Sequence, residues 1–369
     1  MARRALVLAR RYAARGVHKT HEDTSMQAFQ FKQFAARPLR AIAAAMALLT
    51  AAMPAAHAAS EKLRIAEQFG IVYLLLNVAR DQGYIEQRGK QAGVDIEVEW
   101  VKLSGGSAVN EALLSGSIDI AAAGVGPLLT IWDRTHGRQG VKGIASLGNL
   151  PTYLVSTNPE VKTIADLGPD DRIALPAVRV SVQARYLQMA AARQWGDAQY
   201  DRLDKLTVGL PHPDATAAII NGGTEVTAHF ATPPFWNQEL AGNPQAHKIL
   251  SSYDVLGGPG SSTLLFATTR FQQTRRKVFD AFLDALQDAE QFVKAHPDQA
   301  ADIYIRTSGA RIDRDFLVSI IKDPDIQYKT TPENTYPLAK FMHQVGAIKN
   351  LPASWKDYFF DDARIAAGS

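Results

Sequence analysis

The sequence contains no cysteine, and this absence excludes several classes of protein. A chain without cysteine forms no disulfide scaffold, has no cysteine nucleophile and carries no lipid anchor on a cysteine after a signal sequence. Hydrophobic residues make up 46% and charged residues 21% of the 369 positions, so the chain is too apolar for a disordered protein. Its length predicts about two domains with a substantial core.

The chain after residue 58 also lacks a large excess of positive or negative charge. The formal net charge is +3 and the pI is near 8.9, but residues 1–58 hold nine of the 40 basic and two of the 37 acidic residues. The remaining residues have 31 basic and 35 acidic side chains, a balance of −4. This balance does not indicate nucleic acid as a partner, so any preference for an anionic ligand must come from local donors.

Long hydrophobic runs are scarce, and the run near the N-terminus is typical of a secretory signal. Residues 41–53 are uncharged and Ala-rich, follow Arg37 and Arg40, and precede the small-residue pattern Ala-His-Ala at 56–58. Thirteen residues are too few to span a bilayer core of ~30 Å as a helix. We predict a signal peptide over residues 1–58 and export to the periplasm; the alternative is an Ala-rich buried helix.

From residue 63 onward, short apolar runs alternate with amphipathic segments. Crossovers of about 10–20 residues between them predict βαβ units, and therefore mostly parallel sheets with helices on both faces. The expected strands are 63–66, 94–101, 118–123, 141–147, 153–156, 172–175, 206–208, 226–230 and 263–267. The expected helices are 73–81, 107–114, 126–132, 181–193, 214–220, 275–294, 297–306, 313–321 and 332–345.

This order predicts a two-lobed α/β protein. We expect the first lobe to use residues 59–148 and the second residues 149–262, with residues 263–369 returning to the first lobe and adding C-terminal helices. Two passages, near 146–149 and 260–264, form the expected hinge, where glycines give the backbone freedom. The signal peptide precedes them, with a possible true start at Met26.

Ligands of open α/β sheets lie beyond the carboxyl ends of the strands, where helix N-termini present free N–H groups. Five junctions of this kind stand out, at residues 68–71, 104–107, 124–127, 179–181 and 229–234. At 104–107, two glycines allow close backbone approach and Ser107 is expected to cap the following helix. The candidate ligand-binding residues are Gln68, Phe69, Gly70, Tyr73, Gly105, Gly106, Ser107, Gly124, Val125, Arg179, Ser181, His229, Phe230 and Thr232.

Catalytic motifs are missing from the sequence. There is no Gly-x-Ser-x-Gly and no His-Glu-x-x-His, and the six histidines after residue 58 form no pair with metal-ligand spacing. His229 is therefore either a structural histidine or a ligand-facing one. Asp361 and Asp362 are expected to be a solvated chain end. We predict ligand binding rather than turnover, with no metal and no cofactor.

Several stretches resemble the periplasmic substrate-binding proteins of ABC importers, in the nitrate, sulfonate and taurine branch. The first is VARDQGYIE at 78–86, followed by VDIEV at 94–98, the glycines at 105–106 and ALLSGSIDIA at 112–121. IADL at 164–167 and RIALP at 172–176 resemble the entrance to the second lobe of these proteins, and Ser181 matches their ligand-side serine. The resemblance covers roughly residues 62–295.

The resemblance implies a type II periplasmic-binding-protein fold in which a monomer closes on a small solute and delivers it to an inner-membrane ABC permease. Ser107, Ser181, Thr232 and Arg179 would then bind an oxyanion head, and the aromatic rings at 69, 73 and 230 its apolar part. The chain departs from the family at 177–180 and 226–232, where the second lobe would close. The ligand therefore stays open among alkanesulfonate, taurine, nitrate, a carboxylate and an aromatic precursor.

Two other functions remain. The first is an enzyme on the same fold, like the pyrimidine-precursor synthases related to this family. The eukaryotic synthases carry a cysteine-rich motif, which a chain without cysteine lacks. The second is a sensor module whose loaded form is detected by a membrane receptor.

Overall fold

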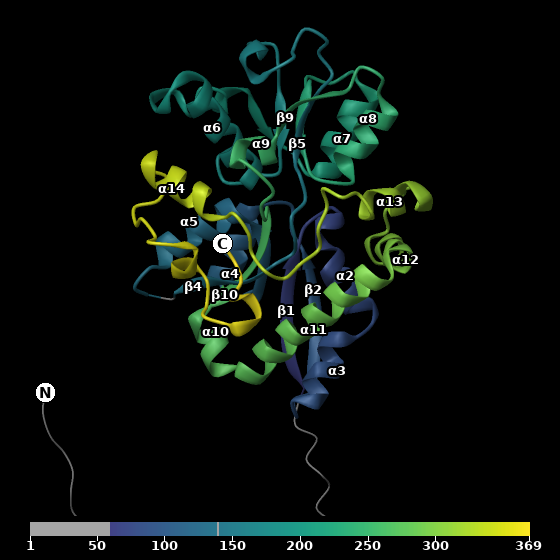
Figure 1. Ribbon diagram of the computed structural model, residues 1–369, viewed down its shortest axis with the longest axis vertical. Helices are drawn as coiled ribbons and strands as arrows, with labels where there is room; N and C mark the ends of the chain where they lie inside the picture. Colours follow the sequence, from purple (N-terminus) through teal and green to yellow (C-terminus); the bar gives the residue numbers. More distant parts are fainter. Residues whose placement is uncertain (1–59, 139) are drawn as a thin grey trace, which may run out of the picture. The chain divides into compact units, whose positions relative to one another are not determined.

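The computed structural model describes residues 60–138 and 140–369, so the predicted signal peptide lies outside the described residues. Two five-stranded sheets form the framework (Figure 1). The first sheet has the order β2-β1-β3-β10-β4 and the second the order β7-β6-β8-β5-β9. The ten strands are β1 (Glu61–Glu67), β2 (Ile96–Lys102), β3 (Ile120–Gly124), β4 (Val141–Ser146), β5 (Tyr153–Ser156), β6 (Ile173–Leu175), β7 (Thr207–Gly209), β8 (Ala228–Ala231), β9 (His247–Ser251) and β10 (Thr263–Thr268).

Each sheet contains one reversed strand. In the first sheet, β1 pairs in parallel with β2 and β3, whereas β10 is antiparallel to β3 and β4. In the second sheet, β6 is parallel to β7 and β8, whereas β5 is antiparallel to β8 and β9. The reversed strands are those that the chain forms directly after crossing from one sheet to the other. The predicted α/β fold is confirmed, with two sheets that are mixed rather than mostly parallel in their pairing, and we call the halves built on the two sheets lobe 1 and lobe 2.

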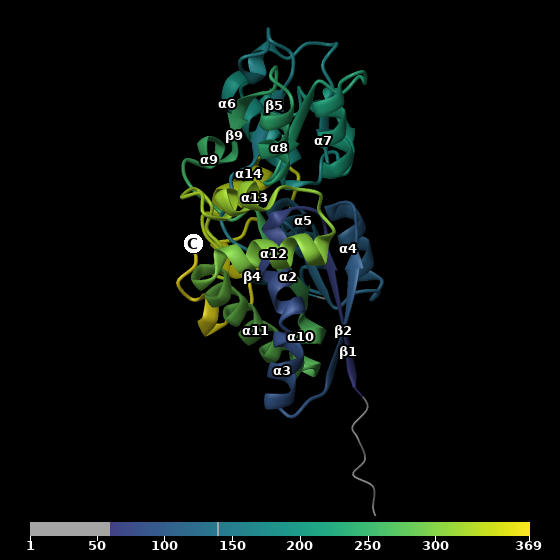
Figure 2. The same ribbon diagram turned by 90° about the vertical axis from the view of Figure 1, so that its right-hand side faces the viewer.

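Helices cover both faces of the sheets, as Figures 1 and 2 show. Because side chains alternate along a strand, Ile120 and Ala122 of β3 pack with α2 and α11, while Ala121 and Ala123 pack with α4 and α5. The helices are α2 (Leu74–Asp81), α3 (Tyr84–Gln91), α4 (Gly106–Leu114), α5 (Val125–Thr135), α6 (Val182–Trp195), α7 (His212–Asn221), α8 (Phe235–Gly242), α9 (Ser252–Leu256), α10 (Thr269–Thr274), α11 (Arg276–Ala295), α12 (Pro297–Ser308), α13 (Arg314–Ile321) and α14 (Tyr336–Gln344). None of the described helices is long and apolar enough to cross a membrane.

The two crossings run where the hinge was expected, and a third segment joins them. The backbone of Asn149 pairs with Ser261 and also with Gln327, and its side chain donates to the Glu333 carboxylate at 2.6 Å. The Ser261 hydroxyl bonds with the Ser146 hydroxyl at 2.9 Å. These bonds satisfy polar groups that would otherwise be buried without partners. The lobe boundaries drawn from the sequence stay predictions.

Most expected elements are present, with instructive exceptions. Helix α3 was not predicted, because only Ile85 and Gly89 of its eight residues are buried and its apolar periodicity is weak. Strand β9 was not predicted either, since it is a partly exposed edge strand. The helix expected over 332–345 begins only at Tyr336.

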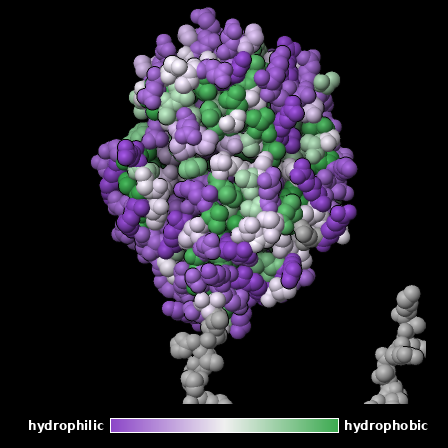
Figure 3. Space-filling model, turned by 180° about the vertical axis from the view of Figure 1, so that it is seen from behind, coloured by the Kyte–Doolittle hydropathy of each residue, from purple (hydrophilic) through white to green (hydrophobic). Residues whose placement is uncertain are grey.

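On the face drawn in Figure 3, apolar residues gather in the middle and hydrophilic ones predominate at the two ends.

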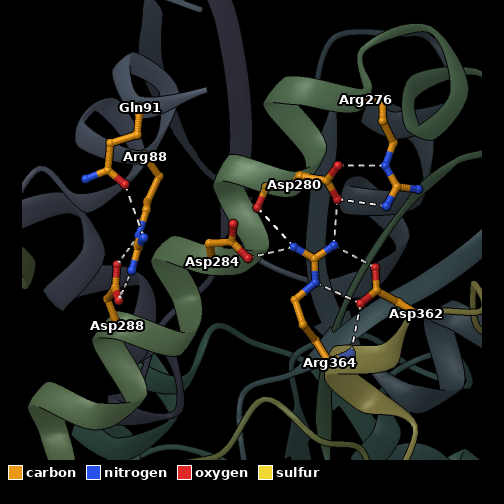
Figure 4. Close-up of polar contacts among 8 residues, drawn as sticks. All are labelled: Arg88, Gln91, Arg276, Asp280, Asp284, Asp288, Asp362 and Arg364. Atoms are coloured by element: carbon orange, nitrogen blue, oxygen red, sulfur yellow. Dashed lines mark hydrogen bonds and ion pairs between the residues drawn. The ribbon is translucent and has the colours of Figure 1, made fainter. Parts of the chain in front are cut away.

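The expectation of a solvated Asp362 is wrong, because this carboxylate belongs to an ion-pair cluster. Arg364 donates to both oxygens of Asp362, and also to Asp280 at 2.6 Å and Asp284 at 2.7 Å on α11 (Figure 4). Burial alone would raise the pKa of Asp362, but the hydrogen bonds from Arg364 lower it overall. The cluster ties the C-terminal segment to α11.

We expect Arg364→Ala to lower the free energy of unfolding by about 2 kcal/mol, because it leaves a largely buried carboxylate without its cation. The matched control is Arg276→Ala, which removes an exposed pair to Asp280 within α11 and should cost less than about 0.5 kcal/mol. Urea unfolding of both variants measures the difference. Equal effects would show that the cluster does not hold the C-terminal segment.

Candidate functional site

The carboxyl ends of both sheets point toward the crossings, and the two lobes meet there. Strand β10 begins opposite Gly124 at the end of β3, and β5 begins opposite Ala231 at the end of β8. The Ile71 amide of lobe 1 donates to the Pro233 carbonyl of lobe 2 at 3.1 Å. The junctions selected from the sequence therefore face one another across a cleft.

Glycines make this approach possible. A Cβ atom on Gly105 would lie 2.6 Å from the Pro176 carbonyl oxygen, and one on Gly124 would lie 2.7 Å from the Val182 side chain. Real Cβ atoms essentially never come this close, so any larger residue would push the lobes apart. The sequence suggested that these glycines admit a ligand; in the structure they admit the opposite lobe.

A small inner cavity of about 30 Å³ remains between the lobes. At 10–15 Å³ for one water centre, it has room for about two water molecules. Seven predicted residues line it: Gln68, Phe69, Tyr73, Gly106, Gly124, Ser181 and Thr232. The Ser181 hydroxyl accepts from the Ala184 amide and caps α6, as expected of a helix N-terminus, whereas the Thr232 hydroxyl is buried without a hydrogen-bond partner in the described part of the chain.

A larger outer cavity of about 550 Å³ opens beside the inner one. Gln68, Phe69, Gly70 and Tyr73 line it, together with residues of α2, α7, α8 and the end of α12. The charged residues that line the outer cavity are Glu67, Lys102 and Arg311. The volume suits a small organic molecule, since ligand pockets commonly measure about 300–1,000 Å³.

Six predicted residues line neither cavity: Gly105, Ser107, Val125, Arg179, His229 and Phe230. Ser107 is the second residue of α4, so the expected serine cap is wrong and Gly105 holds the cap position without a side-chain bond. Val125 and Phe230 belong to the core, and the Arg179 side chain is 72% exposed with its Nε 3.4 Å from Asp204. His229 is fully buried. Their proposed roles in ligand binding are not supported by this placement.

His229 belongs to a chain of buried polar groups behind the inner cavity. Its Nδ1 lies 2.5 Å from Glu239 Oε1, and its Nε2 lies 2.7 Å from His212 Nδ1. His212 Nε2 in turn lies 3.2 Å from the Gln183 amide nitrogen. With both imidazoles neutral, His229 donates to Glu239, His212 donates to His229, and Gln183 donates to His212. This arrangement satisfies all four ring nitrogens.

Sequence reasoning missed His212, Gln183 and Glu67. The rule used for the other candidates would have found two of them, because Glu67 ends β1 and His212 begins the helix directly after β7. The pairing of His212 with His229 was not visible from spacing, since 17 residues separate them. Among the described residues, no group of three or more His, Asp or Glu side chains has a metal-binding arrangement.

The fold and the cleft define a two-lobed α/β protein of the periplasmic-binding-protein kind. Residues 72–300 match the protein family described as NMT1/THI5 like, and the chain belongs to that family. A search of curated proteins found no match.

Solved structures show the same fold. The alkanesulfonate-binding protein SsuA from Xanthomonas axonopodis pv. citri, bound to MOPS, is 18% identical with a TM-score of 0.60, covering 80% of this chain and 96% of its own. SsuA from Escherichia coli is 18% identical with a TM-score of 0.59, covering 83% and 94%. The nitrate-binding protein NrtA from Synechocystis PCC 6803 is 15% identical with a TM-score of 0.61, covering 81% and 84%.

We expect Gly105→Ala to favour separated lobes, because its Cβ would collide with the Pro176 carbonyl oxygen. The backbone of Gly105 is extended, so alanine adds no backbone strain. The matched control is Gly168→Ala, whose Cβ would meet nothing within 4 Å. Small-angle X-ray scattering should give a larger radius of gyration for Gly105→Ala only. An unchanged value would contradict the proposed contact.

The buried imidazole of His212 predicts a loss of stability in mild acid. Burial lowers the pKa of His212 well below its ordinary value, and His229 lowers it further. Below about pH 6.5 His212 is protonated in the unfolded chain but stays neutral in the folded chain. The free energy of unfolding therefore falls as the pH drops below this value. We expect a slope of about 1.4 kcal/mol per pH unit from this residue, measured by urea unfolding between pH 5 and 7. His212→Gln should reduce the slope and His343→Gln should not; equal slopes in the two variants would refute this assignment.

Proposed function

We propose that this protein is the solute-binding component of an ABC importer, which captures a small solute between its lobes and delivers it to an inner-membrane permease. The observation that carries the proposal is the cavity of about 550 Å³ at the carboxyl ends of two facing sheets. A solute that touches both lobes stabilises the closed form by its differential affinity for that form. The importer proteins of the same fold support this role.

The proposed solute contains an anionic group, as in sulfonates, taurine or nitrate. Lys102 and Arg311 border the cavity and supply cations, and the names of the structural neighbours support this class. The predicted signal peptide supports a periplasmic location, and we propose that the exported chain acts as a monomer.

Binding without turnover is the favoured activity, although the family includes enzyme-like members. His229 contacts Glu239 and His212, and His212 also contacts Gln183, so the ring nitrogens of both histidines are engaged in buried hydrogen bonds. Neither ring is thus free to act on a solute in this arrangement. A sensor role would use the same cleft and differ only in the membrane partner.

A thermal-shift screen with sulfonates, taurine, nitrate, carboxylates and aromatic precursors tests the proposal. A solute at one hundred times its Kd stabilises the fold by about 2.7 kcal/mol, which raises the melting temperature by several degrees. Phe69→Ala, at the junction of both cavities, should abolish the shift. Leu114→Ala, an exposed site on α4, should retain it. A shift that survives Phe69→Ala would place binding elsewhere.

A further inference from the structure

The carboxylate of Glu67, at the end of β1, is the least expected feature of the outer cavity. Glu67 is only 4% exposed, although a buried carboxylate is costly unless it is paired. Its Oε1 accepts from Arg80 at 2.8 Å and lies 3.9 Å from Lys102 Nζ. Its Oε2 is buried and has no hydrogen-bond partner among the described residues. One oxygen of this carboxylate is therefore unsatisfied at the cavity wall.

The surrounding residues hold the Glu67 side chain in place but leave its Oε2 atom without a hydrogen bond. The Arg80 guanidinium lies 4.0 Å from the centre of the Trp100 ring, which fixes the cation on Oε1. Burial raises the pKa of Tyr73 and of Tyr304, and the charge of Glu67 raises both further, so both phenols stay neutral. The carboxylate thus lies at the cavity wall among two neutral tyrosines and the Lys102 ammonium group, which is near Oε1 only.

A second acceptor lies on the same wall. Asn77 of α2 lines the outer cavity, is 3% exposed, and its Oδ1 has no partner within the described chain. Phe69 and Phe235 provide apolar surface beside these two acceptors. Two buried acceptors among aromatic rings match a ligand that brings its own N–H donors on an apolar body.

We propose that Glu67 is a specificity-determining residue that accepts a hydrogen bond from an amine or other N–H group of the solute. This inference rests on the proposed solute-binding function and refines it. An anionic group would be repelled by Glu67, so it must lie toward Arg311 at the exposed rim, because Lys102 Nζ lies only 3.9 Å from Glu67 Oε1. The carboxylate therefore sets the orientation of the solute as well as its class.

Matched pairs of compounds that differ by one amino group test this role. The pairs are taurine and ethanesulfonate, L-phenylalanine and 3-phenylpropionate, and 4-aminobutyrate and butyrate, each titrated calorimetrically into the protein. At least one amine should bind tenfold or more tightly than its partner, as expected for a charge-assisted hydrogen bond. Glu67→Gln should remove most of this preference without weakening the compound that lacks the amine.

The control is Glu61→Gln, at the other end of β1, where the carboxylate pairs with Arg275 at 2.9 Å outside both cavities. It should keep the full preference. Asn77→Ala provides a second test if Glu67→Gln folds poorly, and should reduce the preference without removing the Arg80 pair. Melting temperatures without added compound report folding separately.

Each remaining outcome counts against the inference. If the compounds without an amine bind equally well and Glu67→Gln changes nothing, a water molecule satisfies Oε2; solute binding then stands and the role of Glu67 falls. If none of the six compounds binds while another solute of the thermal-shift screen does, the amine role is again refuted and the proposed function is retained. If no solute binds at all, both fall.

Discussion

The close contact between the carboxyl ends of the two sheets is the constraint on which the rest of the structure depends. Both crossings enter their sheets at these ends, so the strand termini, the helix N-termini and the hinge all occupy one region. Gly105 and Gly124 let the lobes approach until backbone meets backbone. The inner cavity is small because the lobes approach so closely. The outer cavity is the space that remains between the lobes beside this contact.

Buried polar groups lie behind this contact in both lobes. In lobe 2, a buried chain of hydrogen bonds from Gln183 to Glu239 engages the ring nitrogens of both histidines, and Glu239 Oε2 has no partner among the described residues. In lobe 1, Glu67 is paired on one oxygen only. The two carboxylates differ in their position, because Glu67 lines the outer cavity whereas Glu239 lines neither cavity.

The fold could be predicted from the sequence because it depends on local patterns. Apolar runs and crossover lengths indicate parallel sheets, and they located nearly all strands.

The site was predicted in part. Gln68, Phe69, Gly70, Tyr73 and Ser181 line the cavities because the end of a strand is recognisable in sequence. Arg179 and Phe230 follow the same rule but lie in solvent and in the core. The direction of a side chain at a strand end depends on its contacts with the opposite lobe. These are tertiary contacts, which the local sequence pattern does not specify. The pairing of Asp362 with Arg364 and α11 has the same origin.

The most direct test of the account is native mass spectrometry of the protein purified from its own cells. The account predicts one small organic molecule bound per chain, lost from Gly105→Ala because its lobes cannot close fully. A chain that carries no molecule, even after incubation with extract of those cells, would contradict a solute-binding role for the cleft.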